Sequence, residues 1–415
     1  MNSDLDTDRL SSLPKNVIET ILMRMPIRDA VRTSILSRGW RFEWSTLPQI
    51  VIDTQPLLSS LGGMQMELDK KIVKTVDHIL LLHHGPIHKF TLSIDLESSS
   101  DIDRWILFLS RNGIKEFSLL KWRGQLYKLP SYFFSWDITY LELYRCAFIP
   151  PTSFKGFSRL TVMTLDRVSF TDNGLATLMS LCPLLKELVL RQVTGCTHLN
   201  ISAQKIVKVV IQGSFHDIRF ESTPLLATAS IKMLEVAGDS LVSKEDCRIV
   251  RVLGDTPSIY QLELLGPTLK NLAVGDVPVH LAAICPVKYL IIDINFEATQ
   301  EMLAAFCMFR SSPAVQKLGI TAISDKKIAT ISSDGFWEGE ESFNCTFSQL
   351  KVVEVTDFSG ITSELKLIEF VLANSPVLER LHIKFKENVA HLVKILKELN
   401  QYRRVSPKAK LFFPG

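Results

Sequence analysis

The chain has 415 residues with a formal net charge of +3, and 46% of its residues are hydrophobic against 22% charged. This composition allows a sizeable core in several domains or in one long repeat array, whereas the charge is too near balance to indicate nucleic acid or an anionic membrane as a partner. Because the N-terminal residues MNSDLDTD are acidic and polar and no run of about 18 apolar residues occurs, we expect no signal peptide and no transmembrane helix.

The first predicted element is a helix that begins at Pro14. Proline suits the first turn of a helix, since its missing N–H has no intrahelical partner there. Ser12 just before it can cap the free N–H groups of that turn. Apolar residues then recur along one helical face until Pro26 ends the helix, namely Val17, Ile18, Ile21, Leu22 and Met25.

A second short helix is predicted after Pro26, with the same apolar spacing at Ile27, Ala30, Val31, Ile35 and Leu36. Gly39 then loosens the backbone before Trp40 and Trp44, which are one helical turn apart. Short helices of this kind carry more apolar surface than about 45 residues can bury among themselves, because so small a domain hides only about 60% of its unfolded surface. The surplus predicts a partner surface.

The residues from Asp8 to Pro48 closely resemble the F-box. The resemblance rests on an early Leu-Pro, an Ile-Leu helix, a second proline, and the runs Asp29-Ala30-Val31-Arg32-Thr33, Leu36-Ser37-Arg38 and Trp40-Arg41. It implies that a three-helix F-box over residues 8–53 binds the adaptor Skp1, and through it a cullin, in a ubiquitin ligase. Gly39 stands where the family commonly has a basic residue, and Glu43 where it commonly has an apolar or aromatic one, so we expect a weaker local helix without lost binding.

The same resemblance assigns the Skp1 contact to the apolar residues of this hairpin. Leu13 and Pro14 would begin the contact edge. Ile21 and Leu22 would fill the groove, and Trp40 would be the large aromatic anchor. The full predicted contact set is Leu13, Pro14, Val17, Ile21, Leu22, Pro26, Ile27, Val31, Leu36 and Trp40. The alternative is that residues 8–48 merely cap the rest of the domain.

A loop at Gly62-Gly63 and an amphipathic helix over Ile72–Leu82 are expected next. After them one pattern returns many times: apolar, two variable residues, apolar, one variable residue, apolar. Its last two apolar positions are two residues apart, as one face of a strand requires. The matches begin at Ile87, Ile114, Ile138, Leu160, Leu185, Ile206, Ile231, Ile259, Leu269, Val287, Val315, Leu350 and Leu378.

Helical segments that stop before a proline separate many of these strands, as at Leu175–Leu181, Glu301–Arg310 and Leu365–Leu372. The early matches start about every 25 residues, which is the period of a leucine-rich repeat. We therefore predict an α/β fold in which residues 54–335 form an irregular leucine-rich-repeat solenoid with a parallel sheet on its concave side. The alternative is an ordinary α/β domain with parallel strands.

Two details of the repeats depart from a regular array. The consensus Asn is absent, so the turns must be satisfied differently. The matches at Ile259 and Leu269 follow one another too closely for two full units. One of them is expected to be a hairpin or a shortened turn around Gly266-Pro267.

The C-terminal part resembles the FBD domain, which follows leucine-rich repeats in a large group of plant F-box proteins. The resemblance covers residues 336–413 and rests on Leu350–Val355, on Phe358-Ser359-Gly360 and on Glu364–Pro376 with Leu378-Glu379. It implies an F-box/FBD/LRR-repeat protein closed by an FBD segment. From the residue pattern alone, this part is expected to be two final repeat units with a helix over Ser363–Asn374 between their strands. That helix is expected to close the open edge of the solenoid.

The sequence contains no phosphate-binding glycine loop and no G-x-S-x-G elbow. His84 and His88 are four residues apart, but Gly85-Pro86 breaks the helix that a metal site of this spacing would need. Asp101 and Asp103 are expected to be solvated acids at a helix start, where acids favour the helix dipole. We predict no enzyme, no cofactor and no metal site.

The seven cysteines are scattered and none forms a C-x-x-C pair. Several lie in apolar runs, which predicts small buried thiols in a reducing compartment, the cytoplasm or the nucleus. Basic runs at Lys70–Lys74 and Arg403–Lys410 are expected to be solvated faces, with a weak nuclear-import signal as the alternative.

These observations predict the substrate-recognition subunit of an SCF-type (Skp1-cullin-F-box) ubiquitin ligase. The F-box would bind Skp1, and strand positions such as Glu142, Thr164, Val189 and Glu263 would face an unidentified target protein. The subunit would act by placement, because a target held near the charged E2 has a raised effective concentration. The alternative is a leucine-rich-repeat scaffold or receptor without ligase association.

Overall fold

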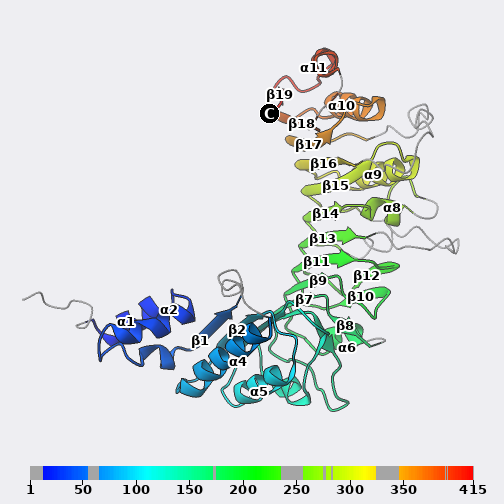
Figure 1. Cartoon of the computed structure of the whole chain (residues 1–415). Helices are drawn as coiled ribbons and strands as arrows, with labels where there is room; N and C mark the ends of the chain where they lie inside the picture. Colours follow the sequence, from blue (N-terminus) through cyan, green and yellow to red (C-terminus); the bar gives the residue numbers. More distant parts are fainter. Residues whose placement is uncertain are drawn as a thin grey trace, which may run out of the picture. The chain divides into compact units, whose positions relative to one another are not determined.

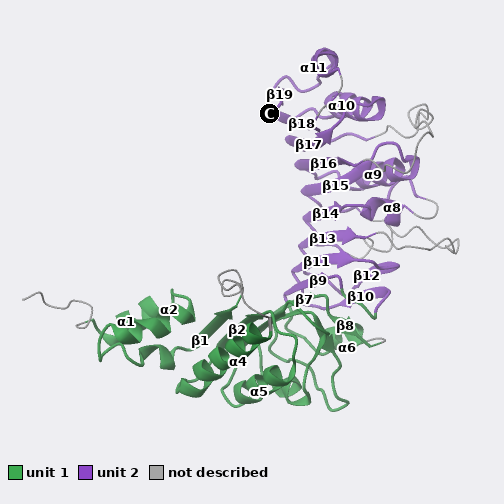
Figure 2. Cartoon of the chain, viewed as in Figure 1, with its two compact units in different colours: residues 1–185, 193–195 green, residues 186–192, 196–415 purple. Residues whose placement is uncertain are grey.

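The computed structural model describes residues 13–54, 65–171, 174–234, 256–273, 277–281, 284–323, 345–387, 389 and 391–414 (Figure 1). The chain divides into two compact units, one of residues 1–185 with 193–195 and one of residues 186–192 with 196–415 (Figure 2). The predicted cap Ser12, the loop at Gly62-Gly63, Cys247 and residues 336–344 of the predicted FBD segment lie outside the described residues. No helix in the described ranges combines the length and the apolar character that a membrane crossing requires.

Unit 1 begins with a helical hairpin. Its elements are α1 (Lys15–Leu22), α2 (Ile27–Arg32) and the 3-10 turns η1 (Thr33–Ile35) and η2 (Glu43–Thr46). The third helix of the predicted hairpin is therefore the short turn η2. The side-chain amide of Gln49 donates to the carbonyl oxygen of Met23 at 3.2 Å, which ties the end of α1 to the strand that follows.

A parallel ladder follows the hairpin in unit 1. It runs in the order β1 (Gln49–Asp53), β2 (Lys89–Ile94), β3 (Glu116–Lys121), β5 (Tyr140–Tyr144) and β7 (Val162–Asp166). The predicted strand positions are confirmed, since Phe90, Phe117 and Leu141 are register partners and all are buried. The strand β1 was not predicted, although Ile50 and Ile52 repeat the same spacing and pair with Phe90 and Leu92.

The segments that connect these strands contain the other elements of unit 1. They include α4 (Gln65–Leu82), α5 (Ser100–Leu109), η3 (Ser131–Ser135) and α6 (Gly174–Ser180), and a small sheet of β4 (Tyr127–Lys128), β6 (Cys146–Phe148) and β8 (Ser169–Phe170). Phenylalanine rings fill the space between these connections and the strands. Ring centroids of Phe117 and Phe133 lie 5.6 Å apart, and those of Phe134 and Phe148 lie 5.1 Å apart. Such offset aromatic pairs add to the burial energy of the core.

Left-handed residues end successive strands of unit 1. Arg145 after β5 has φ 57° and Arg167 after β7 has φ 51°, a region that few side chains adopt. The backbone N–H of Arg145 donates to the carbonyl oxygen of Asp166 at 3.0 Å, and its Nη2 donates to that of Gly124 at 2.6 Å. Arg145 thus satisfies two backbone carbonyl groups near this turn, one through its backbone and one through its side chain.

Unit 2 continues the same architecture with its own parallel ladder. The order is β9 (Glu187–Arg191), β11 (Lys208–Gly213), β13 (Thr228–Met233), β14 (Gln261–Leu265), β15 (Tyr289–Asn295), β16 (Lys317–Ile323), β17 (Val352–Phe358), β18 (Arg380–Phe385) and β19 (Lys410–Phe412). The connections contain α8 (Thr268–Leu272), α9 (Thr299–Ser311), α10 (Thr362–Asn374), α11 (Leu392–Gln401) and the paired strands β10 (His198–Ser202) and β12 (Asp217–Glu221). Figure 1 shows α8, α9 and α10 on the same side of this ladder, so among the described residues these three helices leave the other face of the strands uncovered.

One predicted repeat match is wrong, and one of the two closely spaced matches is not a full repeat, as expected. The match that begins at Ile231 is misplaced, because Ala229 and Ile231 are the register partners of Val209 and Ile211, and the unit therefore starts at Leu226. The middle apolar position of this unit is the small residue Ala229, so the apolar pattern in the sequence did not reveal the unit. The match at Leu269 is the helix α8 rather than a strand, as the turn at Gly266 redirects the chain with φ 59°.

The predicted role of the helix over residues 363–374 is also wrong. That helix is α10, and its predicted place between the two strands of the FBD segment is confirmed, because it lies in the connection between β17 and β18. It is therefore not at the end of the array. Within the described residues, β19 is the last strand of the ladder and pairs with β18 only. It has 3 residues, and a short edge strand is one of the ways in which proteins limit unwanted edge pairing.

Candidate functional site

Two prolines set where the helices of the hairpin begin. Pro14 and Pro26 stand at the N-cap positions of α1 and α2, with φ −60° and −55°. Their carbonyl oxygens accept the first bonds of each helix, from the N–H of Val17 at 2.9 Å and from that of Ala30 at 3.0 Å. Because proline already holds a helical φ, each residue fixes where its helix starts.

One face of the hairpin packs inward against the rest of unit 1. Ile18, Leu22, Ile27 and Ala30 are buried from α1 and α2. Trp40 is 2% exposed, and Trp44 and Leu47 are also buried. These side chains form the core that holds the hairpin together, so they stabilise the site without being open to a partner.

The structure divides the predicted Skp1 contacts into separate groups. Pro14, Val17, Pro26 and Leu36 are exposed, while Leu13, Ile21 and Val31 are half-buried. Leu22, Ile27 and Trp40 are buried in the hairpin core instead. The structure therefore brings the exposed residues to the surface of α1, α2 and the segment after η1, and it places the expected anchor Trp40 inside.

Ile35 is an exposed apolar residue that the predicted contact set omitted. Its side chain is 87% exposed, and Phe42 is 59% exposed. The sequence placed Ile35 on the apolar stripe of the second helix. After Arg32 the helix tightens into the 3-10 turn η1, where Thr33 Oγ1 donates to the carbonyl oxygen of Ala30 at 2.6 Å. A 3-10 turn has about 3.0 residues per turn instead of 3.6, so Ile35 leaves the buried stripe.

Charged groups surround these apolar residues. Arg24, Arg28, Arg32, Arg38 and Arg41 are all exposed. Glu43, one of the departures from the F-box pattern, forms an ion pair with Lys15 at 3.7 Å and so links η2 to α1. The excess of arginine predicts faster association with a partner that carries acidic residues around its binding groove.

The strand positions proposed to face a target lie in single rows. In unit 1, Glu142 of β5 is the register partner of Thr164 of β7. In unit 2, Val189 and Glu263 occupy equivalent positions of β9 and β14, connected through β11 and β13. All of them are half-buried and alternate with core residues. Each unit thus presents one face of its strands to solvent.

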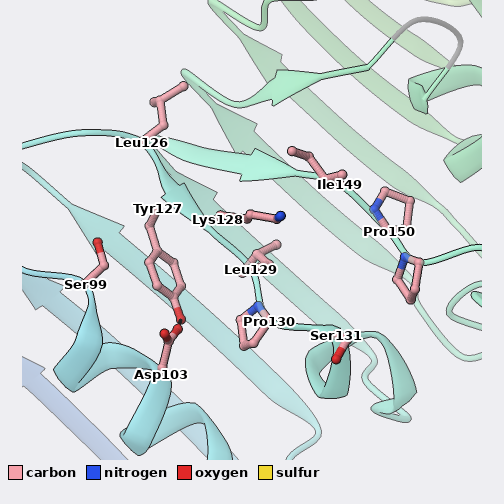
Figure 3. Close-up of a pocket in the computed structure, with 11 residues that line it drawn as sticks. Ser99, Asp103, Leu126, Tyr127, Lys128, Leu129, Pro130, Ser131, Ile149 and Pro150 are labelled. Atoms are coloured by element: carbon pink, nitrogen blue, oxygen red, sulfur yellow. Dashed lines mark hydrogen bonds between the residues drawn. The ribbon is translucent and has the colours of Figure 1, made fainter.

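A hollow of about 700 Å³ lies on unit 1 between α5, β4 and the segment after β6 (Figure 3). Figure 3 shows the ring of Tyr127 pointing toward Asp103, whose Oδ1 accepts a hydrogen bond from the Tyr127 hydroxyl. Asp103 is exposed in the first turn of α5, as expected of a solvated acid at a helix start, and it also accepts this hydrogen bond. Burial raises the pKa of Tyr127 far above its ordinary value, so its hydroxyl stays protonated. Its bond to Asp103 ties β4 to α5, which is a structural role.

The other sequence candidates for chemistry are buried or dispersed. Burial lowers the pKa of His83, and in the described ranges no group of three or more His, Cys, Asp or Glu side chains has the arrangement of a metal site. Burial raises the pKa of the Cys146 thiol to about 12 and that of Cys182 to about 11. These thiols are protonated near neutral pH and are poor nucleophiles.

Comparison with protein families finds matches along most of the chain. The F-box domain matches residues 10–49, the LRR repeats of the FBD-associated F-box protein At5g56370 match residues 102–320, and FBD matches residues 340–383. These matches follow the order that the sequence resemblance implies.

Curated proteins of Arabidopsis thaliana are similar over almost the whole length. The F-box/FBD/LRR-repeat protein At1g13570 is 36% identical, over 98% of this chain and 98% of its own. The F-box/LRR-repeat protein At4g14096 is 25% identical, over 96% of this chain and 86% of its own. The probable FBD-associated F-box protein At1g32375 is 21% identical, over 98% of this chain and 100% of its own.

Proposed function

Because the chain belongs to the plant family of F-box/FBD/LRR-repeat proteins, we propose that it is the substrate-recognition subunit of an SCF-type ubiquitin ligase. The F-box hairpin binds a Skp1-type adaptor, and through it a cullin. The strand faces of the repeats bind a target protein. The proposal gives the chain no catalytic step, and it places the chain in the cytoplasm or the nucleus.

The observation that carries this proposal is the apolar surface of the hairpin. Ile35, Leu36 and Val17 lie in solvent although the hairpin has a well-filled core of its own. Exposed apolar groups of this density on a small element are typical of a protein interface. A stable contact would bury on the order of 1,200–2,000 Å² in total.

A subunit that performs no chemical step can still promote a reaction by binding the ligase and the target at separate sites. The hairpin fixes the chain to the ligase, while the repeats hold the target. Ubiquitin transfer to a held target then becomes effectively intramolecular, and its rate rises with the effective concentration of the target lysine. The affinity of the repeats for the target sets which proteins are modified.

Co-purification of the full-length chain with a plant Skp1 adaptor tests the proposal. The variant Ile35→Asp/Leu36→Asp places charges on exposed positions, so the fold should survive while adaptor binding is lost. The variant Leu81→Asp is the matched control, because Leu81 is 78% exposed on α4 outside the hairpin. It should bind as the wild type does. The variant Leu13→Ala/Pro14→Ala tests the predicted contact edge in the same way.

The second candidate function is a repeat scaffold without a ligase. A folded wild-type chain that does not bind the adaptor would favour this candidate and would refute the ligase proposal. Equal loss of binding in Leu81→Asp and Ile35→Asp/Leu36→Asp would remove the assignment of the contact to the hairpin surface.

A further inference from the structure

The C-terminal strands of unit 2 carry a row of basic side chains. Register pairs Lys317 of β16 with Val352 of β17, Val352 with Arg380 of β18, and Arg380 with Lys410 of β19. In β16, β17 and β18 the positions that alternate with this row are buried. The row therefore belongs to the strand face that α8, α9 and α10 leave uncovered (Figure 1).

A second row lies beside the first on the same face. His382 and Lys384 follow Arg380 at two-residue steps along β18, and His382 is the register partner of Phe412. The rings of His382 and Phe412 stack with centroids 4.8 Å apart and an interplanar angle of 15°. We call the surface formed by Lys317, Arg380, His382, Lys384, Lys410 and Phe412 the basic face.

Among the described residues, most of the positive charge of the basic face has no acidic partner. Glu354 of β17 lies next to Lys317, and its carboxylate bonds the Lys317 Nζ at 2.8 Å. Arg380, Lys384 and Lys410 are exposed, and none of them forms an ion pair with another residue of the described ranges.

We propose that the basic face binds an acidic, extended segment of the target protein. The inference rests on the proposed function, which assigns the strand faces to the target. Arginine presents a planar fork that matches a carboxylate, and lysines on the neighbouring positions supply further point charges. The stacked rings of His382 and Phe412 offer a flat surface for the apolar parts of such a segment.

The geometry also defines which segment fits. Adjacent strands are about 4.8 Å apart, so Arg380 and Lys410 on neighbouring strands stand close enough for successive acidic side chains of one extended peptide. A segment with several Asp or Glu residues in a row would pair with both, whereas a single acid would pair with one only.

Fluorescence anisotropy of a labelled hexaglutamate peptide with the full-length chain bound to its Skp1 adaptor tests the inference. We expect binding that weakens when NaCl is added, since exposed charge pairs are screened by salt. Hexaglutamine should bind far more weakly. The variant Arg380→Glu/Lys410→Glu should lose about tenfold or more in affinity for hexaglutamate, because each reversal removes an attraction and adds a repulsion.

The variant Lys394→Glu/Lys397→Glu is the matched control. It changes net charge by the same amount at exposed positions of α11, outside the basic face, and should leave peptide affinity within about twofold of wild type. Equal losses in both variants, or equal affinity for hexaglutamate and hexaglutamine, would refute the inference. Tighter binding of an oligothymidylate than of hexaglutamate would reassign the surface to nucleic acid and would refute it as well.

Adaptor binding separates this inference from the proposed function. The variant Arg380→Glu/Lys410→Glu should still co-purify with the Skp1 adaptor. A wild-type chain that binds the adaptor but not hexaglutamate refutes the basic face alone. A folded chain that binds hexaglutamate but does not bind the adaptor refutes the ligase proposal. The chain would then be a receptor for acidic segments.

Discussion

The hydroxyl of Tyr127 in β4 donates a hydrogen bond to the carboxylate of Asp103 in α5, so a helix and a strand from different connections are joined by one side-chain bond. Tyr127 is 1% exposed, and the hydroxyl of Tyr132 donates to the backbone carbonyl oxygen of the same Asp103 at 2.7 Å. Two tyrosines, one in β4 and one in η3, thus hold the first turn of α5 in place.

The variant Tyr127→Phe should lower the free energy of unfolding by about 1.5–3 kcal/mol, since the buried tyrosine loses its hydrogen bond to a charged group. Urea denaturation followed by tryptophan fluorescence measures this change. Tyr132→Phe is the control, because its bond is exposed and goes to a neutral acceptor, so its effect should stay below about 1 kcal/mol. Equal effects of the two variants would contradict the structural role given to Tyr127.

Gly156 should not tolerate a side chain. It has φ 90°, and a Cβ built on it would collide with the backbone carbonyl group of Leu181. We expect Gly156→Ala to lower the free energy of unfolding by more than about 3 kcal/mol, because backbone strain and the collision add. Gly113 also has a positive φ, of 68°, but no atom lies near its Cβ position. Gly113→Ala should therefore cost only about 1–2 kcal/mol in the same urea titration.

Glu364 should make stability depend on pH in a defined direction. It is buried at the start of α10 and accepts hydrogen bonds from the N–H of Ser359 at 2.9 Å and from that of Gly360 at 2.7 Å. Burial raises the pKa of Glu364 above its ordinary value, and these bonds oppose the rise. The folded state therefore binds this proton more tightly than the unfolded state does.

The sign of the effect follows from that difference. The raised pKa contributes stability that is fully present below the unfolded-state pKa and is lost as pH rises through the folded-state pKa. The wild type should accordingly gain stability relative to Glu364→Gln as pH falls from about 7 to about 5. Thermal melting of both proteins across this range measures the gain. A difference that shrinks on acidification would show that hydrogen bonding, not burial, dominates the pKa.

Substitution of Trp40 should lower stability, whereas substitution of Leu36 should weaken adaptor binding. Trp40→Ala removes a buried ring and should lower the free energy of unfolding by about 3–5 kcal/mol, so that adaptor binding falls only because the hairpin unfolds. Leu36→Asp changes a residue that is 54% exposed and should lose adaptor binding with little change in melting temperature. Melting and co-purification together separate packing from contact. A stable Trp40→Ala protein that does not bind would restore Trp40 as the interface anchor.

The sequence by itself determined the family and most strand positions. The spacing of apolar residues at strand positions such as Phe90 and Leu92 is local, and burial of one strand face requires it wherever the chain folds. The same holds for Pro14 and Pro26, whose fixed φ sets the helix starts without help from distant residues. The domain boundaries at residues 53–54 and 335–336 stay predictions.

The misplaced unit at Ile231 shows where a local pattern becomes ambiguous. Both Leu226-x-x-Ala229-x-Ile231 and Ile231-x-x-Leu234-x-Val236 fit the same spacing, and only the pairing of Ile231 with Ile211 selects the first. Register depends on hydrogen bonds to the preceding strand, so a single segment does not contain it.

Tertiary structure alone decided which apolar residues of the hairpin are buried and which are open to a partner. Val17, Leu22, Ile35 and Trp40 look alike in the sequence, since all are apolar at helical spacing. Packing against the rest of unit 1 buries Leu22 and Trp40 in the core, and the 3-10 turn η1 places Ile35 in solvent. The basic face was decided in the same way, because Lys317, Arg380 and Lys410 are far apart along the chain and meet only through the register of parallel strands. Periodicity specifies which face of an element is apolar, but the free energy of burial is realised only against the neighbours that the complete fold supplies.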